Sequence, residues 1–202
     1  MPTQAERSAA SRRELVDAAI ALVAERGYHA TSVADIGARA GQSRAAVNFH
    51  FGSKEALLLA IVRHVVEEWE QRMLLPDLER AATSPEALVA AGIGAHRRLL
   101  AEQPAMFALH HNLMAEAIGR NPAVKDEFAA LDLRMRGRIA DLVARAKGAG
   151  AIRDDVDPGG LAAWFLGALR GIAQQHLVAP SGLDLDAAYG ELRLAVLARI
   201  LP

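Results

Sequence analysis

Apolar residues recur at helical spacing along almost the whole sequence. A first stripe of this kind, on one face of a helix, comprises Leu15, Ala18, Ala19, Leu22 and Val23. Alternating β-branched runs bounded by Asn-Gly or Asp-Gly turns, which are typical of strands and hairpins, do not occur. The pattern predicts an all-α protein.

Capping and stop signals set the expected helix boundaries. Ser11 and Glu14 have the spacing of a capping box, which predicts the start of the first helix, and Gly27 predicts its end. A long helix follows from Lys54 to about Leu75 and is expected to end at Pro76. Proline and glycine breaks predict five further helices, at about 85–102, 104–118, 122–147, 158–178 and 185–201.

Two short helices between Ser32 and His50 have helix-turn-helix spacing. Ser32 is placed to cap one helix and Ser43 the next, and Gly41 lies in the sharp turn that must join them. Gly37, four residues before Gly41, lets the two helices approach closely. This spacing favours DNA binding, although other three-helix packing motifs produce it as well.

Composition narrows the class of protein. The 202 residues are 52% hydrophobic, include no cysteine and carry a net charge of -1, which excludes a disulfide scaffold and a polycationic DNA binder. The polar N-terminus lacks the apolar core of a signal peptide, and the longest charge-free apolar run, 158–169, is too short to cross a membrane. We therefore expect a cytoplasmic protein. DNA contact would depend on a local patch at 36–54, which holds Arg39, Arg44 and Lys54 and no acid.

The stretch Ala40 to Leu57, AGQSRAAVNFHFGSKEAL, closely resembles the TetR family of bacterial repressors, and the resemblance extends from Arg12 to Leu59. It implies a homodimer that binds double-stranded operator DNA through its N-terminal helices and a small effector through its C-terminal helices. The implied domains are a three-helix DNA-binding domain, 1–53, and a helical domain for dimerisation and ligand binding, 54–202. The implied function is a transcriptional regulator, by family default a repressor that its effector releases.

The motif and the resemblance together indicate which residues contact DNA. The expected set is Thr31, Ser32, Ser43, Arg44, Ala45, Asn48, Phe49, His50 and Lys54. Arg44 is suited to bridge guanine O6 and N7, with a phosphate contact or a solvated first-turn arginine as the alternative. Asn48 would either pair with adenine or form polar surface. By resemblance, Lys54 contacts a phosphate.

The other expected DNA contacts have structural alternatives. Thr31 and Ser32 are expected near phosphate because helix N-termini present free amides to anions, although Ser32 would also serve as a simple cap. Phe49 is expected to touch sugar and phosphate, and Phe51 to lie in the core. His50 is expected to pack and to lend a hydrogen bond to phosphate.

Three positions depart from the family pattern. Ala46 replaces a frequent threonine, Asn48 replaces a bulkier ring, and Gln42 stands where an apolar residue is common. These departures bear on which operator is read and on how the turn packs.

The C-terminal half suggests an interface and a ligand pocket. Helix 158–178 is rich in small residues, and Leu194, Leu197 and Leu201 share one face of helix 185–201, so these two helices are the expected dimer interface, or else pack within one subunit. Pocket candidates, each with plain core as its alternative, are Trp69, Met73, His96, Phe107, His110, Met114, Trp164, Phe165 and Gln174. Adjacent His110 and His111 cannot share a metal as an i, i+4 pair can, and we expect no metal site and no cofactor.

The sequence also bears on two other classes of protein, an enzyme and a helical protein-interaction module. Gly41 to Ala45 lacks the second glycine and the strand of a hydrolase nucleophile elbow, and Gly148 to Gly150 fails the dinucleotide fingerprint, so we do not expect an enzyme. A helical protein-interaction module that has lost DNA binding remains the third possibility.

Overall fold

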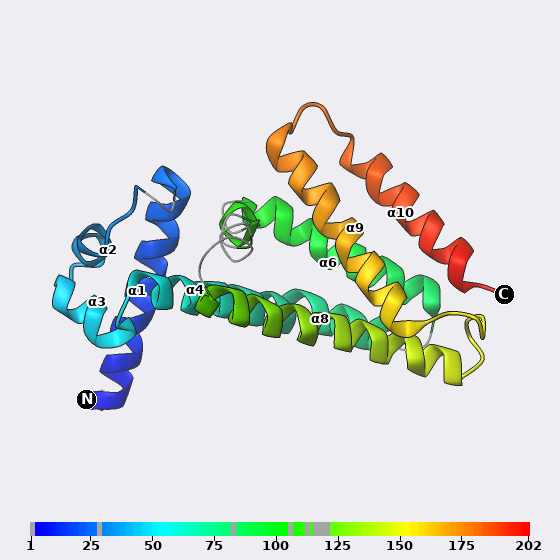
Figure 1. Ribbon diagram of the computed structural model, residues 1–202, viewed down its shortest axis with the longest axis horizontal. Coiled ribbons are helices and arrows are strands. Elements are labelled where there is room, and N and C mark those ends of the chain that lie inside the picture. Colours follow the sequence, from blue (N-terminus) through cyan, green and yellow to red (C-terminus); the bar gives the residue numbers. More distant parts are fainter. Residues whose placement is uncertain (1–2, 28–29, 82–83, 105–106, 112–113, 115–121) are drawn as a thin grey trace. The chain divides into compact units, whose positions relative to one another are not determined.

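The computed structural model describes residues 3–27, 30–81, 84–104, 107–111, 114 and 122–202. Within these ranges the regular structure is helical and contains no strand, which confirms the all-α prediction. The helices of the described ranges are α1 (Gln4–Arg26), α2 (Val33–Arg39), α3 (Arg44–Phe51), α4 (Lys54–Trp69), α5 (Leu75–Ala81), α6 (Pro85–Glu102), α8 (Pro122–Gly148), α9 (Pro158–Val178) and α10 (Leu185–Ile200), with a π-helical segment, η1 (Glu70–Leu74), between α4 and α5. Figure 1 labels all of them except α5 and η1. No helix in the described ranges combines the length and hydrophobicity needed to cross a bilayer.

The chain forms two compact units. The first comprises residues 1–67 and 108–125, and the second comprises 68–107 and 126–202. Most of α4 thus groups with the three N-terminal helices. The division into functional domains at 53/54 remains a prediction.

The first helix begins earlier than the sequence pattern predicted. Its N-cap is Thr3, whose hydroxyl accepts a hydrogen bond from the Glu6 amide while the Glu6 carboxylate accepts from the Thr3 amide. The predicted box at Ser11 and Glu14 is therefore wrong. The intervening residues contain no proline or glycine, so the helix extends upstream to the earlier box. The predicted inward face and the end at Gly27, φ +80°, are confirmed.

The long connecting helix does not end at Pro76. The chain remains helical through α4, η1 and α5 as far as Ala81. Pro76 is the second residue of α5, immediately after the π-helical segment. The change of hydrogen-bond register in η1 allows a residue without an amide hydrogen to enter the first turn of the next helix.

The later helix boundaries follow the sequence signals closely. Predicted helices 85–102 and 158–178 coincide with α6 and α9, and those at 122–147 and 185–201 differ from α8 and α10 by one residue at one end. Of the predicted helix 104–118, residues 104, 107–111 and 114 are helical, and the other positions lie outside the described residues. Each agreement rests on a local signal, a proline in the first turn or an aspartate or serine cap.

In the second unit, α9 lies beside α6 and α10, as Figure 1 shows. Its main core is built from the inward faces of these helices and from two residues of the loop before α9. The buried members are Val89, Ile93, Ile152, Val156, Phe165, Leu169, Tyr189, Leu192, Val196 and Ile200. The core therefore joins segments that are far apart in the sequence.

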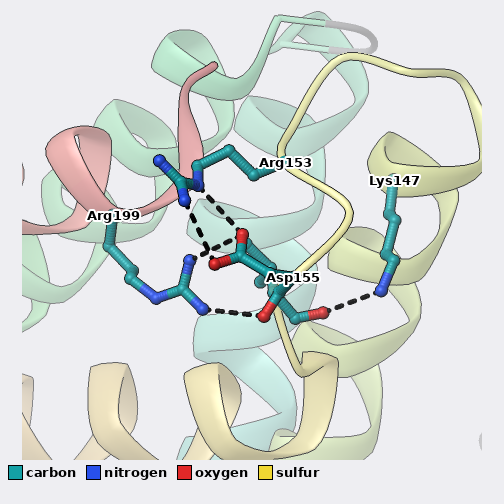
Figure 2. A network of polar contacts seen from close by, with 5 residues as sticks. Lys147, Arg153, Asp155 and Arg199 are labelled. Atoms are coloured by element: carbon teal, nitrogen blue, oxygen red, sulfur yellow. Dashed lines mark hydrogen bonds and ion pairs between the residues drawn. The ribbon is translucent and has the colours of Figure 1, made fainter.

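Ion pairs around Asp155 hold the loop between α8 and α9 against the C-terminal helix (Figure 2). Arg153 Nε donates to the Asp155 carboxylate at 2.9 Å, and Arg199 on α10 donates to the Asp155 carbonyl oxygen at 2.8 Å. Lys147 Nζ donates to the carbonyl of Val156 at 3.0 Å. The Arg153 guanidinium, with Arg199, lowers the pKa of Asp155 to about 2, so this carboxylate stays ionised at neutral pH.

Candidate nucleic-acid interface and ligand pocket

The helix α3 exposes one face to solvent and buries the other. Arg44, Ala45, Asn48 and Phe49 are exposed, and the Phe49 side chain is 82% accessible. Val47, on the opposite side, is 1% accessible. An exposed phenylalanine beside an arginine and an asparagine on a short helix is the expected form of a recognition surface.

Glycines set the position of the turn before α3. Gly41 has φ +66°, a left-handed conformation that most other residues avoid. At Gly37 a Cβ would lie 2.9 Å from the carbonyl oxygen of Gln42 and 3.1 Å from the carbonyl carbon of Ser43. The Ser43 hydroxyl then accepts a hydrogen bond from the Ala46 amide at 3.1 Å and caps α3. The close approach predicted for Gly37 is confirmed, and the neighbour is the backbone of the turn.

Gln42 attaches the turn to α1 through hydrogen bonds, at a position where the family often has an apolar residue. Its amide nitrogen donates to the Ser11 carbonyl at 3.1 Å and to the Glu14 carboxylate at 3.0 Å. Its amide oxygen accepts from the Ser11 hydroxyl at 2.8 Å. Polar contacts therefore hold this corner of the first unit.

His50 is half-buried and contacts the same serine. Its Nε2 lies 3.0 Å from the Ser11 hydroxyl oxygen. Because the Ser11 hydroxyl hydrogen is given to Gln42, His50 Nε2 is the donor in this contact. The guanidinium of Arg12 lies 5.0 Å from the ring centre of Phe51, which is half-buried as well. His50 is thus a packed residue that helps to fix the end of α3 on α1.

Arg39, from the predicted basic patch, and Thr31, from the expected phosphate contacts, each bond to another residue of the protein. Arg39 forms a two-pronged ion pair with Glu25, at 2.7 and 3.1 Å, and its hydrogen bonds lower the pKa of that carboxyl. Its charge is therefore largely compensated within the protein. Thr31 is 1% accessible and its hydroxyl donates to the Gly27 carbonyl at 2.9 Å, which argues against a phosphate contact by this side chain. Ser32 caps α2 in a capping box with Asp35.

The second unit contains an apolar cavity of about 120 Å³. Leucine, valine, isoleucine and phenylalanine side chains from η1, α5, α6, α8, α9 and α10 form most of its wall. The polar lining side chains that the structure describes are His96 and Arg138. Arg138 forms an ion pair with Glu70 at 2.6 Å, and Glu70 is only 8% accessible. A largely apolar space with a few polar groups is typical of a small-molecule site.

His96 is held by two neighbours in the interior of the second unit. Its Nδ1 lies 2.9 Å from the Tyr189 hydroxyl, and its ring meets Phe107 edge-on with ring centres 4.9 Å apart. Burial raises the pKa of Tyr189 to about 12, so the phenol stays neutral. His96 lines the cavity, and its contacts with Tyr189 and Phe107 fix the orientation of its ring.

Residues 15–61 match the family model described as "Bacterial regulatory proteins, tetR family", and residues 109–192 match "Tetracyclin repressor-like, C-terminal domain". The chain belongs to the TetR family. The members of this family are regulatory proteins rather than enzymes. The exposed helix α3 of this chain is therefore the second helix of a helix-turn-helix unit.

Relatives of this TetR-family chain include regulators of several kinds. It is 40% identical over 79 residues to the HTH-type transcriptional regulator BetI of Brucella canis, a match that covers 39% of each chain. A transcriptional regulator from Saccharomonospora viridis, solved with choline, superposes with a TM-score of 0.80 at 25% identity, covering 96% of this chain and 99% of that one. SmeT, the repressor of the Stenotrophomonas maltophilia efflux pump SmeDEF, solved with triclosan, gives a TM-score of 0.78 at 27% identity, covering 96% of this chain and 92% of that one.

The predicted ligand-binding residues of this TetR-family chain divide into three groups. His96 and Phe165 line the cavity, and Phe107 is not among the lining residues but is buried in contact with the His96 ring. Trp164, 46% accessible, and Gln174 are exposed on α9, and neither is among the lining residues. Half-buried His110 and Met114 belong to the first unit. The side chains of Trp69 and Met73 lie outside the described part of the chain.

Sequence reasoning missed Arg138 and Glu70. Aromatic, methionine and histidine side chains are the usual pocket candidates by residue type, whereas α8 carries many charges. A signal was nevertheless present, because Arg138 lies within the apolar series Met135, Ile139 and Leu142 at helical spacing. A charged residue next to a series of inward-facing apolar residues on one helix is a candidate polar group for a pocket.

Proposed function

We propose that this protein is a transcriptional regulator that binds operator DNA through α3 and represses the adjacent genes until a small effector releases it. The observation that carries the proposal is the exposed face of α3. Arg44, Asn48 and Phe49 lie free of the core while Val47 and the Ser43 cap fix the helix beneath them. This arrangement leaves three different side chains available to base edges and the DNA backbone. The regulator would act where bacterial DNA lies, in the cytoplasm.

Each exposed residue of α3 suits a particular contact. The Arg44 guanidinium would bridge guanine O6 and N7 or contact a phosphate, and Asn48 would pair with adenine. Phe49 has no hydroxyl, so its contact would be with sugars or a thymine methyl group. Ala45, Ser43 and Ser32 would lie against the DNA backbone at the helix N-termini, with Lys54 as a further phosphate contact, whereas the Nε2 donor of His50 is already used on Ser11.

We infer that two chains associate through α9 and α10. The exposed residues of α9 within the described part of the chain carry no charge and include Gly160, Ala163, Trp164, Gly167 and Val178. Small residues permit close approach of a partner helix, and Trp164 supplies apolar area. On α10, Leu194 is 59% accessible, whereas Leu197 and Leu201 pack against their own core, so the three leucines do not form one exposed face.

The effector would bind in the apolar cavity of the second unit. In support, similar proteins have been solved with choline and with triclosan. The link to DNA would be α4, which begins at Lys54 and continues directly into η1, whose last residue, Leu74, lines the cavity. One continuous helical path thus connects a DNA-binding residue with the ligand site.

A gel-shift assay with the promoter region beside the gene tests the proposal. We expect a complex of two chains per site that outcompetes random DNA, with affinity falling steeply as salt rises, because phosphate contacts release counterions. Replacement of exposed Arg134 on α8 by alanine is the matched control and should leave binding unchanged. Equal affinity for promoter and random DNA, or saturation at one chain per duplex, would contradict the proposal.

A further inference from the structure

The cavity of the second unit contains one charged lining residue whose partner lies in the π-helical segment. Arg138 on α8 is one of the lining residues, although its side chain is 47% accessible, and its guanidinium forms an ion pair with the Glu70 carboxylate in η1, which is 11% accessible. On the basis of the proposed function, we propose that the effector is an apolar molecule with a carboxylate group, and that this carboxylate takes the place of Glu70 on Arg138.

The lining chemistry favours an anionic head group. An apolar body gains by entering a wall of aliphatic side chains, but a polar head needs a partner there, since an unpaired polar group in such a space is costly. Among the lining residues that the structure describes, Arg138 is the only one with a permanent charge. A guanidinium binds a carboxylate with paired, parallel hydrogen bonds.

The same lining disfavours a quaternary ammonium such as choline. Such cations are held by aromatic faces, often several around one site. The aromatic rings that line this cavity in the described residues are those of Phe165 and His96, and His96 is engaged with Tyr189 and Phe107. No carboxylate is among the lining residues that the structure describes, so a cation finds no counter-charge there. Similarity to a choline-bound regulator therefore does not carry its ligand over to this chain.

Exchange of carboxylates on Arg138 would also move η1. Glu70 is 8% accessible, so once displaced its carboxylate must find water or another partner, because a buried unpaired charge is strongly unfavourable. Both ends of η1 are involved, since Glu70 is its first residue and Leu74, its last, lines the cavity. π-Helical turns are uncommon and often mark functional sites. The exchange thus couples ligand binding to the segment that continues α4.

Three probes with one tail length and different head groups test the proposal on the full-length protein: decanoate, 1-decanol and decyltrimethylammonium, each titrated by calorimetry. We expect decanoate to bind most tightly. Arg138→Gln should weaken decanoate binding about ten- to a hundredfold, the range for one charge-assisted hydrogen bond, and leave 1-decanol binding unchanged. Glu70→Gln should tighten decanoate binding by about tenfold because it removes the competing carboxylate.

The opposite effects of the two variants separate ligand contact from a purely structural role. If Arg138 and Glu70 only stabilise the fold, both variants will weaken binding of every probe alike. That result, or decanoate binding no more tightly than 1-decanol, overturns the proposal. If Arg138→Gln does not fold, Glu70→Gln decides alone. Gel shifts run in parallel keep the two proposals apart, because promoter binding without a response to decanoate rejects the ligand class and leaves the regulator in place.

Discussion

Replacement of Gly37 by alanine tests the packing on which the position of α3 depends. The new Cβ would lie 2.9 Å from the Gln42 carbonyl oxygen and 3.1 and 3.2 Å from the carbonyl carbon and oxygen of Ser43. All three are backbone atoms of the turn, so α2 or the turn must move. Overpacking of this kind costs about 1–3 kcal/mol. Alanine regains about 1 kcal/mol through its higher helix propensity, so the expected net loss is about 0–2 kcal/mol.

Gly137 in the middle of α8 provides the matched control. No atom lies within 4 Å of a Cβ at this exposed position, so Gly137→Ala should stabilise the protein by about 0.5–1 kcal/mol through propensity alone. Urea unfolding followed by circular dichroism measures both variants, and gel shifts report the displacement of α3 as weaker promoter binding by Gly37→Ala. If Gly37→Ala were stabilised as much as Gly137→Ala and bound promoter normally, the close approach of α2 to the turn would be refuted.

Four further predictions concern single contacts and the coupling of the sites. Arg44→Ala should cost about 1–3 kcal/mol of promoter affinity and relax specificity at one base pair per half-site, as a panel of mutated promoters in gel shifts would show; equal losses on random DNA would indicate a phosphate contact. Tyr189→Phe should lower the unfolding free energy by about 1–3 kcal/mol in urea titrations because the buried nitrogen of His96 loses its partner. Burial opposes ionisation of Asp132, but Arg170, at 2.5 Å, and a second arginine outweigh it and hold its pKa below the usual 3.8. The ionised Asp132 therefore stabilises the fold fully above about pH 4, and this stabilisation is lost as the pH falls further. In the Asp132→Asn variant, the free energy of unfolding should fall less steeply as the pH is lowered through this range. Saturating promoter DNA should weaken effector binding by the same factor by which the effector weakens DNA binding, and fluorescence titrations that show no such change would contradict coupling.

Most helix boundaries could be predicted from the sequence because each depends on a few neighbouring residues. Ser84 with Pro85, and Asp157 with Pro158, act within a single turn and place the starts of α6 and α9 wherever those helices pack. Gly41 could likewise be assigned to the turn before α3, because the left-handed conformation is a local requirement. The family could be recognised for the same reason, since its motif is one continuous stretch.

Local sequence signals gave a wrong helix boundary at two places, one where two capping signals occur close together and one where the backbone changes its hydrogen-bond pattern. Thr3 and Ser11 each begin a sequence that fits a capping box, and only the complete helix shows that the earlier one is used. Pro76 is a normal helix stop, but the π-helical turn before it lets the helical path continue. The sequence pattern carries no sign of that change of register.

The lining of the candidate ligand cavity was decided by the tertiary structure. Whether a side chain lines the cavity depends on how α6, α8, α9 and α10 meet, and those contacts join residues far apart in the chain. Trp164 was a reasonable pocket candidate by residue type, yet α9 turns it to the exterior while its neighbour Phe165 faces the cavity. Arg138 and Glu70 are 68 positions apart and carry no shared motif, so only the tertiary structure brings their charges together. The sequence by itself therefore determined the helices and the DNA-binding motif, because each depends on residues that are close together in the chain. The fold determined the cavity, because its lining residues are spread over the chain.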